Sequence, residues 1–163
     1  MRQRRPRRPL AVCPTITLAR SISDAMRRHR VRPGLDWIGG QNFGFDIDSA
    51  SDANLARRVM EFDVLHQGSK TRPCELPCVH LTVDWPALRP TRKEMEEAGR
   101  EALAALGMGN SMAVFVGHNG WQSAELHVIA CKINPDTNRA YQLHRSHTRL
   151  NWWARRYGRG WSK

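Results

Sequence analysis

Two apolar, β-branched segments constrain the fold most, because only a short polar loop separates them. They run from Met112 to Gly117 and from Glu125 to Ile133, and the loop contains Asn119-Gly120. An Asn-Gly pair between two such runs is typical of a β-hairpin turn. The sequence therefore predicts an antiparallel hairpin over these two segments.

Further patterns predict the elements around this hairpin. Residues 79–84 alternate apolar and polar side chains, as a strand with one buried face does. Thr91 and Glu94 have the spacing of a capping box, and they begin a helix that Gly107 ends. Weaker patterns predict helices over 16–30, 51–67 and 148–157, a short strand over 42–45, and a turn over 134–138. Helices interleaved with antiparallel strands indicate an α+β fold, with helices packed against one antiparallel sheet.

The length of 163 residues fits a single domain. We expect a basic flexible arm over residues 1–12, one domain over 13–160, and a tail over 161–163. No stretch of about 18 apolar residues is present, and the arginine-rich start lacks the apolar segment of a signal peptide. These features predict a cytoplasmic protein without a membrane partner. The four cysteines match no zinc-binding spacing and are expected to be reduced thiols.

The charge balance predicts a polyanionic partner. Lys and Arg total 26 against 15 Asp and Glu, which gives a net charge of +11. Much of the excess lies near the two ends of the chain, where we expect nucleic-acid contacts from six arginines, Arg4, Arg5, Arg7, Arg8, Arg155 and Arg156. Basic ends that only solubilise the protein are the alternative. Trp121 and Trp152 are the candidates for stacking on unpaired bases, whereas core packing is the expectation for Trp153.

The predicted hairpin brings three potential metal ligands together. Glu125 and His127 alternate on one strand and therefore project from the same face. His118 ends the preceding strand, so the pairing of the strands places it opposite them. Two imidazoles and a carboxylate suit a divalent cation and leave coordination positions for substrate oxygens. The spacing alone equally allows these side chains to lie on a solvated sheet face without a metal.

Several motifs, in this order and spacing, give the chain a family resemblance. They are His80-Leu81-Thr82-Val83-Asp84-Trp85-Pro86, Val114-Phe115-Val116-Gly117-His118-Asn119, Glu125-Leu126-His127-Val128-Ile129 and Asn134-Pro135-Asp136-Thr137. With the helix between the first two, this pattern resembles the MobA/VirD class of relaxases. The resemblance implies a fold like that of the HUH endonucleases, with a divalent cation held by His118, Glu125 and His127. It also implies metal-dependent nicking of single-stranded DNA at a transfer origin during plasmid mobilisation or conjugation, with accessory mobilisation proteins as possible partners.

Two positions depart from the pattern of that family. Glu125 stands where the family usually has a histidine, which favours Mg²⁺ or Mn²⁺ because a carboxylate is a hard ligand. The family's nucleophilic tyrosine is expected near Ala25-Met26, where this chain has none; its two tyrosines are Tyr141 and Tyr157. The nucleophile is then Tyr141, a serine (Ser21 or Ser23), or water. A degenerate relaxase relative that binds DNA without cutting it is the alternative function, and a ribosomal-type RNA binder would fit the charge alone.

Overall fold

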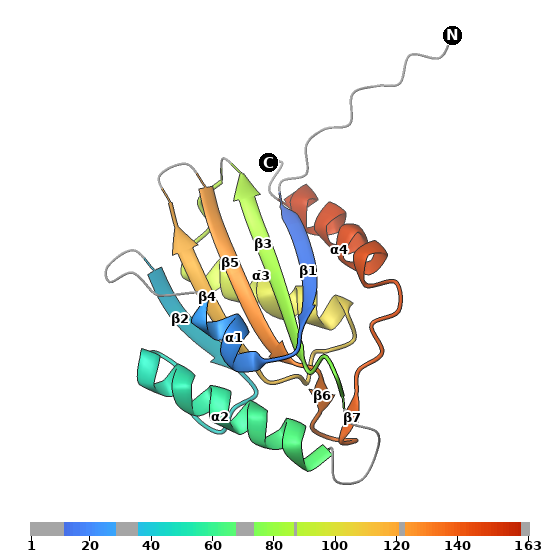
Figure 1. Ribbon diagram of the computed structural model, residues 1–163. Coiled ribbons are helices and arrows are strands. Elements are labelled where there is room, and N and C mark those ends of the chain that lie inside the picture. The colour runs from blue at the N-terminus through green and yellow to red at the C-terminus, as the bar shows by residue number, and fades with distance from the viewer. Residues whose placement is uncertain (1–11, 29–35, 68–73, 87, 121–122, 161–163) are drawn as a thin grey trace.

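The chain forms one five-stranded antiparallel sheet with helices on both faces (Figure 1). The computed structural model describes residues 12–28, 36–67, 74–86, 88–120 and 123–160. The order of the strands in the sheet is β1-β3-β5-β4-β2. These strands are β1 (Cys13–Ala19), β2 (Asp36–Gln41), β3 (Cys78–Pro86), β4 (Ala113–Asn119) and β5 (Ser123–Cys131). The α+β class expected from the sequence is confirmed.

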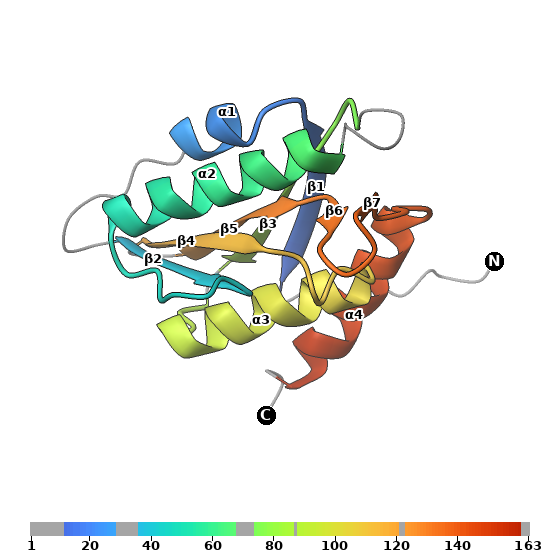
Figure 2. The ribbon, with the colours of Figure 1, turned by 90° about the horizontal axis from the view of Figure 1, so that it is seen from below.

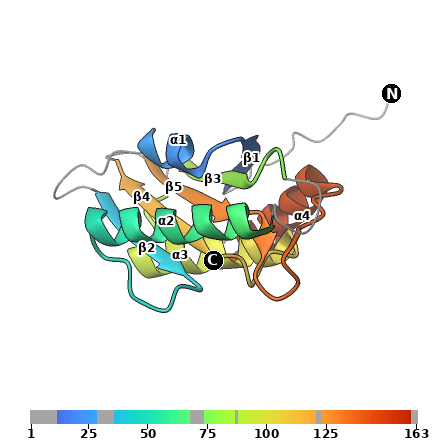
Figure 3. The same cartoon turned by 60° about the horizontal axis from the view of Figure 1, so that its bottom comes forward.

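Four helices form the two outer layers, as Figure 2 shows from below and Figure 3 from an intermediate angle. One layer contains α1 (Ile22–Arg27) and α2 (Ala50–Gln67), and the other contains α3 (Arg92–Ala105) and α4 (Ser146–Gly160). Each layer covers its own buried cluster of side chains. Ile38, Val114 and Ile129 lie under α1 and α2, whereas Leu81, Phe115 and Leu126 lie under α3 and α4. The sheet is therefore buried on both faces over most of its length.

The predicted hairpin is confirmed as β4 and β5, which pair in the central part of the sheet. Their register places His118 opposite Glu125 and Val116 opposite His127. On the other side of β5, β3 places Asp84 opposite Glu125 and Thr82 opposite His127. The pairing of three neighbouring strands thus fixes which side chains surround His127.

The predicted capping box at the start of α3 is present. The Thr91 side chain accepts a hydrogen bond from the Glu94 amide, and the Glu94 carboxylate accepts one from the Thr91 amide at 2.7 Å. Gly107 follows the helix with a φ of 76°, in the left-handed region that favours glycine. The predicted turn over 134–138 also forms, and it connects the two-residue strands β6 (Ile133–Asn134) and β7 (Arg139–Ala140).

One prediction near the N-terminus is confirmed only over Ile22–Arg27, and another is wrong. The helix expected over 16–30 is instead β1 followed by the short α1, because Thr15 and Thr17 alternate with Ile16 and Leu18 in the period of a strand. The strand expected over 42–45 is a series of bends, since Asn42 has a φ of 61° and leaves the extended region. The strand of this part of the chain is β2, which comes directly before it.

Some sequence predictions fall on residues that the structure does not describe. The basic arm, except for Val12, and the tail over 161–163 belong to this group. Among the helices that are described, none has both the length and the apolar character needed to cross a membrane.

Candidate functional site

A row of polar residues crosses all five strands at one end of the sheet. In strand order the row contains Cys13, Asp84, Glu125, His118 and Asp36, and each residue lies directly opposite the next. Directly opposed residues point to the same face of an antiparallel sheet, so these side chains share the face that α1 and α2 cover. The Cβ atoms of such neighbours are about 4.5–5.5 Å apart, which brings each side chain within reach of the next.

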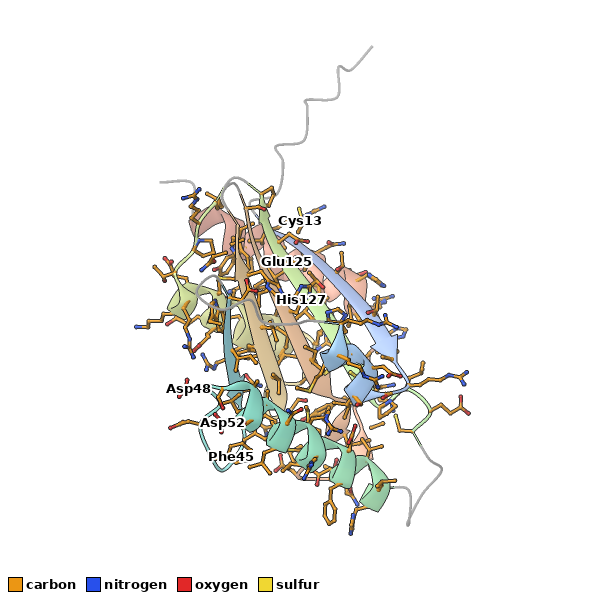
Figure 4. The ribbon with its side chains drawn as sticks, turned by 60° about the vertical axis from the view of Figure 1, so that its left-hand side comes forward. Cys13, Phe45, Asp48, Asp52, Glu125 and His127 are labelled. Atoms are coloured by element: carbon orange, nitrogen blue, oxygen red, sulfur yellow. The ribbon has the colours of Figure 1, made fainter. Side chains whose placement is uncertain are left out.

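His127 lies one step inside this row and contacts polar groups on both sides of its ring. Its Nδ1 lies 3.1 Å from His80 Nε2 and 3.3 Å from Thr82 Oγ1. Its Nε2 lies 3.3 Å from Glu125 Oε1. Figure 4 shows Glu125 and His127 next to each other on β5, with Cys13 near the same end of the sheet. The residue is only 7% exposed, so its ring is held inside the protein.

His118 lies beside a carboxylate on the neighbouring strand. Its Nδ1 lies 2.9 Å from Asp36 Oδ1, a distance that allows a close electrostatic contact, although the geometry falls short of a hydrogen bond. The His118 ring meets the His127 ring edge-on, with the ring centroids 5.2 Å apart. The residue before His118 must be a glycine, because a Cβ atom at Gly117 would lie 2.0 Å from the Trp37 indole.

Two of the three carboxylates of the row, Glu125 and Asp84, are held in surroundings that disfavour their charge. Burial raises the pKa of Glu125, the facing Asp84 raises it further, and His118 lowers it. Burial also raises the pKa of Asp84. The pKa of His80 is lowered, first by burial and then by the guanidinium of Arg28, just after α1. A bound cation would stabilise both carboxylates in their charged form.

The side chains present have the chemistry of a divalent-metal site. Metal-binding histidines commonly use one ring nitrogen for the ion and the other for a supporting protein group. In this site, Nδ1 of His118 and Nδ1 of His127 both face supporting groups, and Nε2 of His127 faces the Glu125 carboxylate. As the side chains are placed, no group of three or more His, Cys, Asp or Glu residues within the described ranges has the geometry of a metal site. The types of donor and the groups beside them fit a cation, but the side chains would have to move for three of them to reach one ion.

The structure does not bring Tyr141 to the three predicted ligands. Its amide donates to the Lys132 carbonyl, beyond the end of β5 that is remote from Glu125. Its side chain packs with the cluster under α3 and α4, on the other face of the sheet from His127. Burial raises the pKa of its hydroxyl, which is buried and has no hydrogen-bond partner among the described residues.

The position expected for the family's tyrosine, Ala25-Met26, lies in α1. This helix packs on β3 and β5, on the same face as His80 and His127. Ala25 is buried there and Met26 is partly buried, and neither side chain has a hydroxyl that could act as the nucleophile. Ser21 accepts a hydrogen bond from the Asp24 amide as the N-cap of this helix, while Ser23 is half-buried.

The residues predicted to bind nucleic acid fall into two groups. Arg4, Arg5, Arg7, Arg8 and Trp121 lie outside the described residues. Trp152, Arg155 and Arg156 are exposed on α4, which covers the face opposite to His127. The structure therefore separates these α4 residues from the polar row.

Sequence reasoning missed four residues that belong to the site: His80, Thr82, Asp84 and Asp36. The first three were visible as the polar half of the alternation over 79–84, but that strand was interpreted only as having one buried face. No comparable signal marked Asp36, because the strand that it begins was not predicted.

Comparison with protein families identifies the chain over most of its length. Residues 45–159 match the model of the relaxase family described as a MobA/VirD2-like nuclease domain. The match runs from the loop before α2 into α4 and includes β3, β4 and β5, which carry His80, His118, Glu125 and His127. Searches of curated proteins and of solved structures gave no match. Because the matched region covers well over half of the chain, the chain belongs to the relaxase family, with a nuclease domain of the MobA/VirD2-like type.

Proposed function

We propose that this relaxase domain is a divalent-metal-dependent endonuclease that nicks single-stranded DNA at a transfer origin in plasmid mobilisation or conjugation. The observation that carries the proposal is the support of both histidines at Nδ1. Asp36 lies beside His118, and His80 and Thr82 lie beside His127. This arrangement directs the opposite nitrogens toward the Glu125 side of the site.

His118, Glu125 and His127 would hold Mg²⁺ or Mn²⁺, for which the carboxylate is a suitable hard ligand. Such an ion neutralises charge on the scissile phosphate during in-line displacement. The Glu125 side chain is 43% exposed, so the site is open to solvent on this side and a phosphate could reach a cation held there. Arg28 adds a positive charge close to His80.

His80 is a positioning residue in this proposal, because it acts through His127. When Nε2 of His127 binds a cation, Nδ1 carries the proton, and His80 Nε2 can accept it at the observed 3.1 Å. His80→Gln retains a polar atom at that place, whereas His80→Leu does not. We expect His80→Leu to weaken Mn²⁺ binding by about 10- to 100-fold and His80→Gln to restore most of the affinity. Equal affinities for the two variants would contradict this role.

Water is the proposed nucleophile, since α1 has no tyrosine and Tyr141 lies on the other face. A water oxygen forms a bond to phosphorus and the bond to the 3′ oxygen breaks. The proton released by the water ends on that 3′ oxygen. The products are a 5′-phosphate and a 3′-hydroxyl, and no protein–DNA link forms.

The test is incubation of labelled single-stranded DNA carrying a transfer origin with the protein and Mn²⁺. We expect free nicked product from the unmodified protein and from His66→Ala, a change at the exposed end of α2, and none from His127→Ala. A covalent protein–DNA adduct that disappears in Tyr141→Phe would instead establish Tyr141 as the nucleophile. DNA binding without cleavage in any divalent ion would establish the alternative, a non-catalytic relaxase relative, which the absence of a tyrosine from α1 favours.

A further inference from the structure

The arginines of α4 differ from Arg57 on α2 and from Arg92 and Arg100 on α3, which form ion pairs within their own helices. Arg57 pairs with Glu61 at 2.7 Å, and Arg92 and Arg100 both pair with Glu96, at 2.8 and 3.4 Å. The sequence of α4 contains no acidic residue. Three arginines of α4 have described side chains, Arg149, Arg155 and Arg156, and Arg145 comes directly before the helix. Within the described parts of the chain, no carboxylate pairs with any of these four. No described carboxylate therefore neutralises the charge of these side chains.

These cationic side chains border a hollow of about 1060 Å³ between α3, α4 and the segment before α4. Arg145, Arg149 and Arg156 contribute to its wall together with Trp152 and Trp153. The one acidic residue in the wall is Glu101, and its carboxylate accepts a hydrogen bond from the Trp153 indole at 3.1 Å. The hollow thus combines apolar rings with an excess of positive charge.

Trp152 is placed for stacking rather than for packing. Its side chain is 62% exposed, whereas Trp153 is 7% exposed and belongs to the core. The Arg156 guanidinium lies 5.3 Å from the centre of the Trp152 ring. An exposed indole next to guanidinium groups is the arrangement that holds a base and its phosphate in proteins that bind single strands.

We propose that this hollow binds an unpaired nucleotide of single-stranded DNA, at a second contact on the opposite face of the sheet from His127. The base stacks on Trp152, and the flanking phosphates contact Arg145 and Arg156. An acidic peptide would satisfy the arginines but would leave the exposed indole without a planar partner. The inference deepens the proposed function by adding a DNA contact, and it requires DNA binding but not cleavage.

Fluorescence anisotropy with labelled oligothymidylate and the full chain tests the proposal. We expect Trp152→Ala to weaken binding about tenfold, because one base loses its stacking partner. Phe62→Ala is the matched control, since Phe62 is an equally exposed aromatic residue on α2. We expect Arg145→Gln and Arg156→Gln each to reduce the log–log salt slope by about 0.7, and Arg58→Gln, at an exposed position on α2, to leave it unchanged.

The outcomes separate this proposal from the nicking activity. The anisotropy is measured in chelator-treated buffer, so that cleavage and cation binding at His127 do not contribute to the affinity. Equal losses in Trp152→Ala and Phe62→Ala, or no loss in either, would overturn the proposal. So would polyglutamate that competes as strongly as unlabelled oligothymidylate, because the hollow would then be a site for acidic peptides.

Discussion

The two faces of the sheet are buried by similar helical layers, yet they carry different kinds of side chain. Under α3 and α4, the strands contribute residues such as Val83, Phe115 and Leu126, and none of the strand side chains on this face is titratable. Under α1 and α2, the same strands contribute the polar row, His80, His127 and the thiols of Cys78 and Cys131. The strands thus separate a face that stabilises the fold from a face that can carry chemistry. Neighbouring residues such as Glu125 and Leu126 belong to opposite faces.

A charge on the apolar face should have the largest effect. Leu126 is fully buried, and its side chain fits closely against Gly99. We expect Leu126→Glu to reduce the free energy of unfolding by more than about 4 kcal/mol, because the carboxylate has no partner there. Urea unfolding followed by circular dichroism measures this change. Ser123→Glu, at an exposed position of the same strand, should stay within about 0.5 kcal/mol. An unchanged urea midpoint in Leu126→Glu would refute the assignment of the faces.

Two buried thiols lie on the other face of the sheet, under α1 and α2, and they should make the free energy of unfolding depend on pH. Burial raises the pKa of Cys78 and of Cys131 from 9.0 to about 12. Their stabilising effect is complete below about pH 9, where both states are protonated, and is lost as the pH rises toward 12. We expect each thiol to account for a loss of about 2 kcal/mol by about pH 11.

The measurement is the urea midpoint as a function of pH. The double variant Cys78→Ala, Cys131→Ala should lose less stability between neutral and alkaline pH than the unmodified chain, whatever its stability at neutral pH. Cys13→Ala, which removes an exposed thiol, should follow the unmodified chain. Identical pH profiles for all three proteins would show that the buried thiols do not contribute.

The smallest expected effect comes from Glu125, whose charge would help to bind a cation but lowers the stability of the fold. Burial and Asp84 both disfavour the charged form of Glu125. We therefore expect Glu125→Gln to increase the free energy of unfolding by about 0.5 kcal/mol in chelator-treated buffer, since like charges opposed across strands are destabilising. Thermal unfolding measures the change. Glu97→Gln is the control, since Glu97 is at an exposed position of α3 with Lys93 at 4.0 Å, and this change should not increase stability. A clear loss of stability in Glu125→Gln would mean that the carboxylate supports the fold.

Much of this face could be predicted from the sequence, because the hairpin is local. The short loop after His118 fixes its register with Glu125, so the alternation of a strand suffices to bring both near His127. His80 and Asp84 alternate just as clearly, but their relation to β5 depends on pairing between segments some 40 residues apart. No local pattern determines that pairing, and the prediction of the site was therefore incomplete.

The N-terminal part of the site was less accessible. β1 and α1 together occupy a segment whose apolar spacing was too weak to separate a strand from a helix. Asp36 begins β2, and its role depends entirely on the pairing of β2 with β4, which places it opposite His118. Tyr141 shows the converse problem, since composition made it a candidate and only the topology placed it on the other face.

The central claim is that the polar face of the sheet is a cation site centred on His127. Titration of the chelator-treated protein with Mn²⁺, followed by electron paramagnetic resonance of the free ion, tests it without DNA or turnover. The account predicts one saturable site in the unmodified chain and in His66→Ala, and its loss in His127→Ala. Absence of saturable binding in the unmodified chain, or equal binding in His127→Ala, would contradict it.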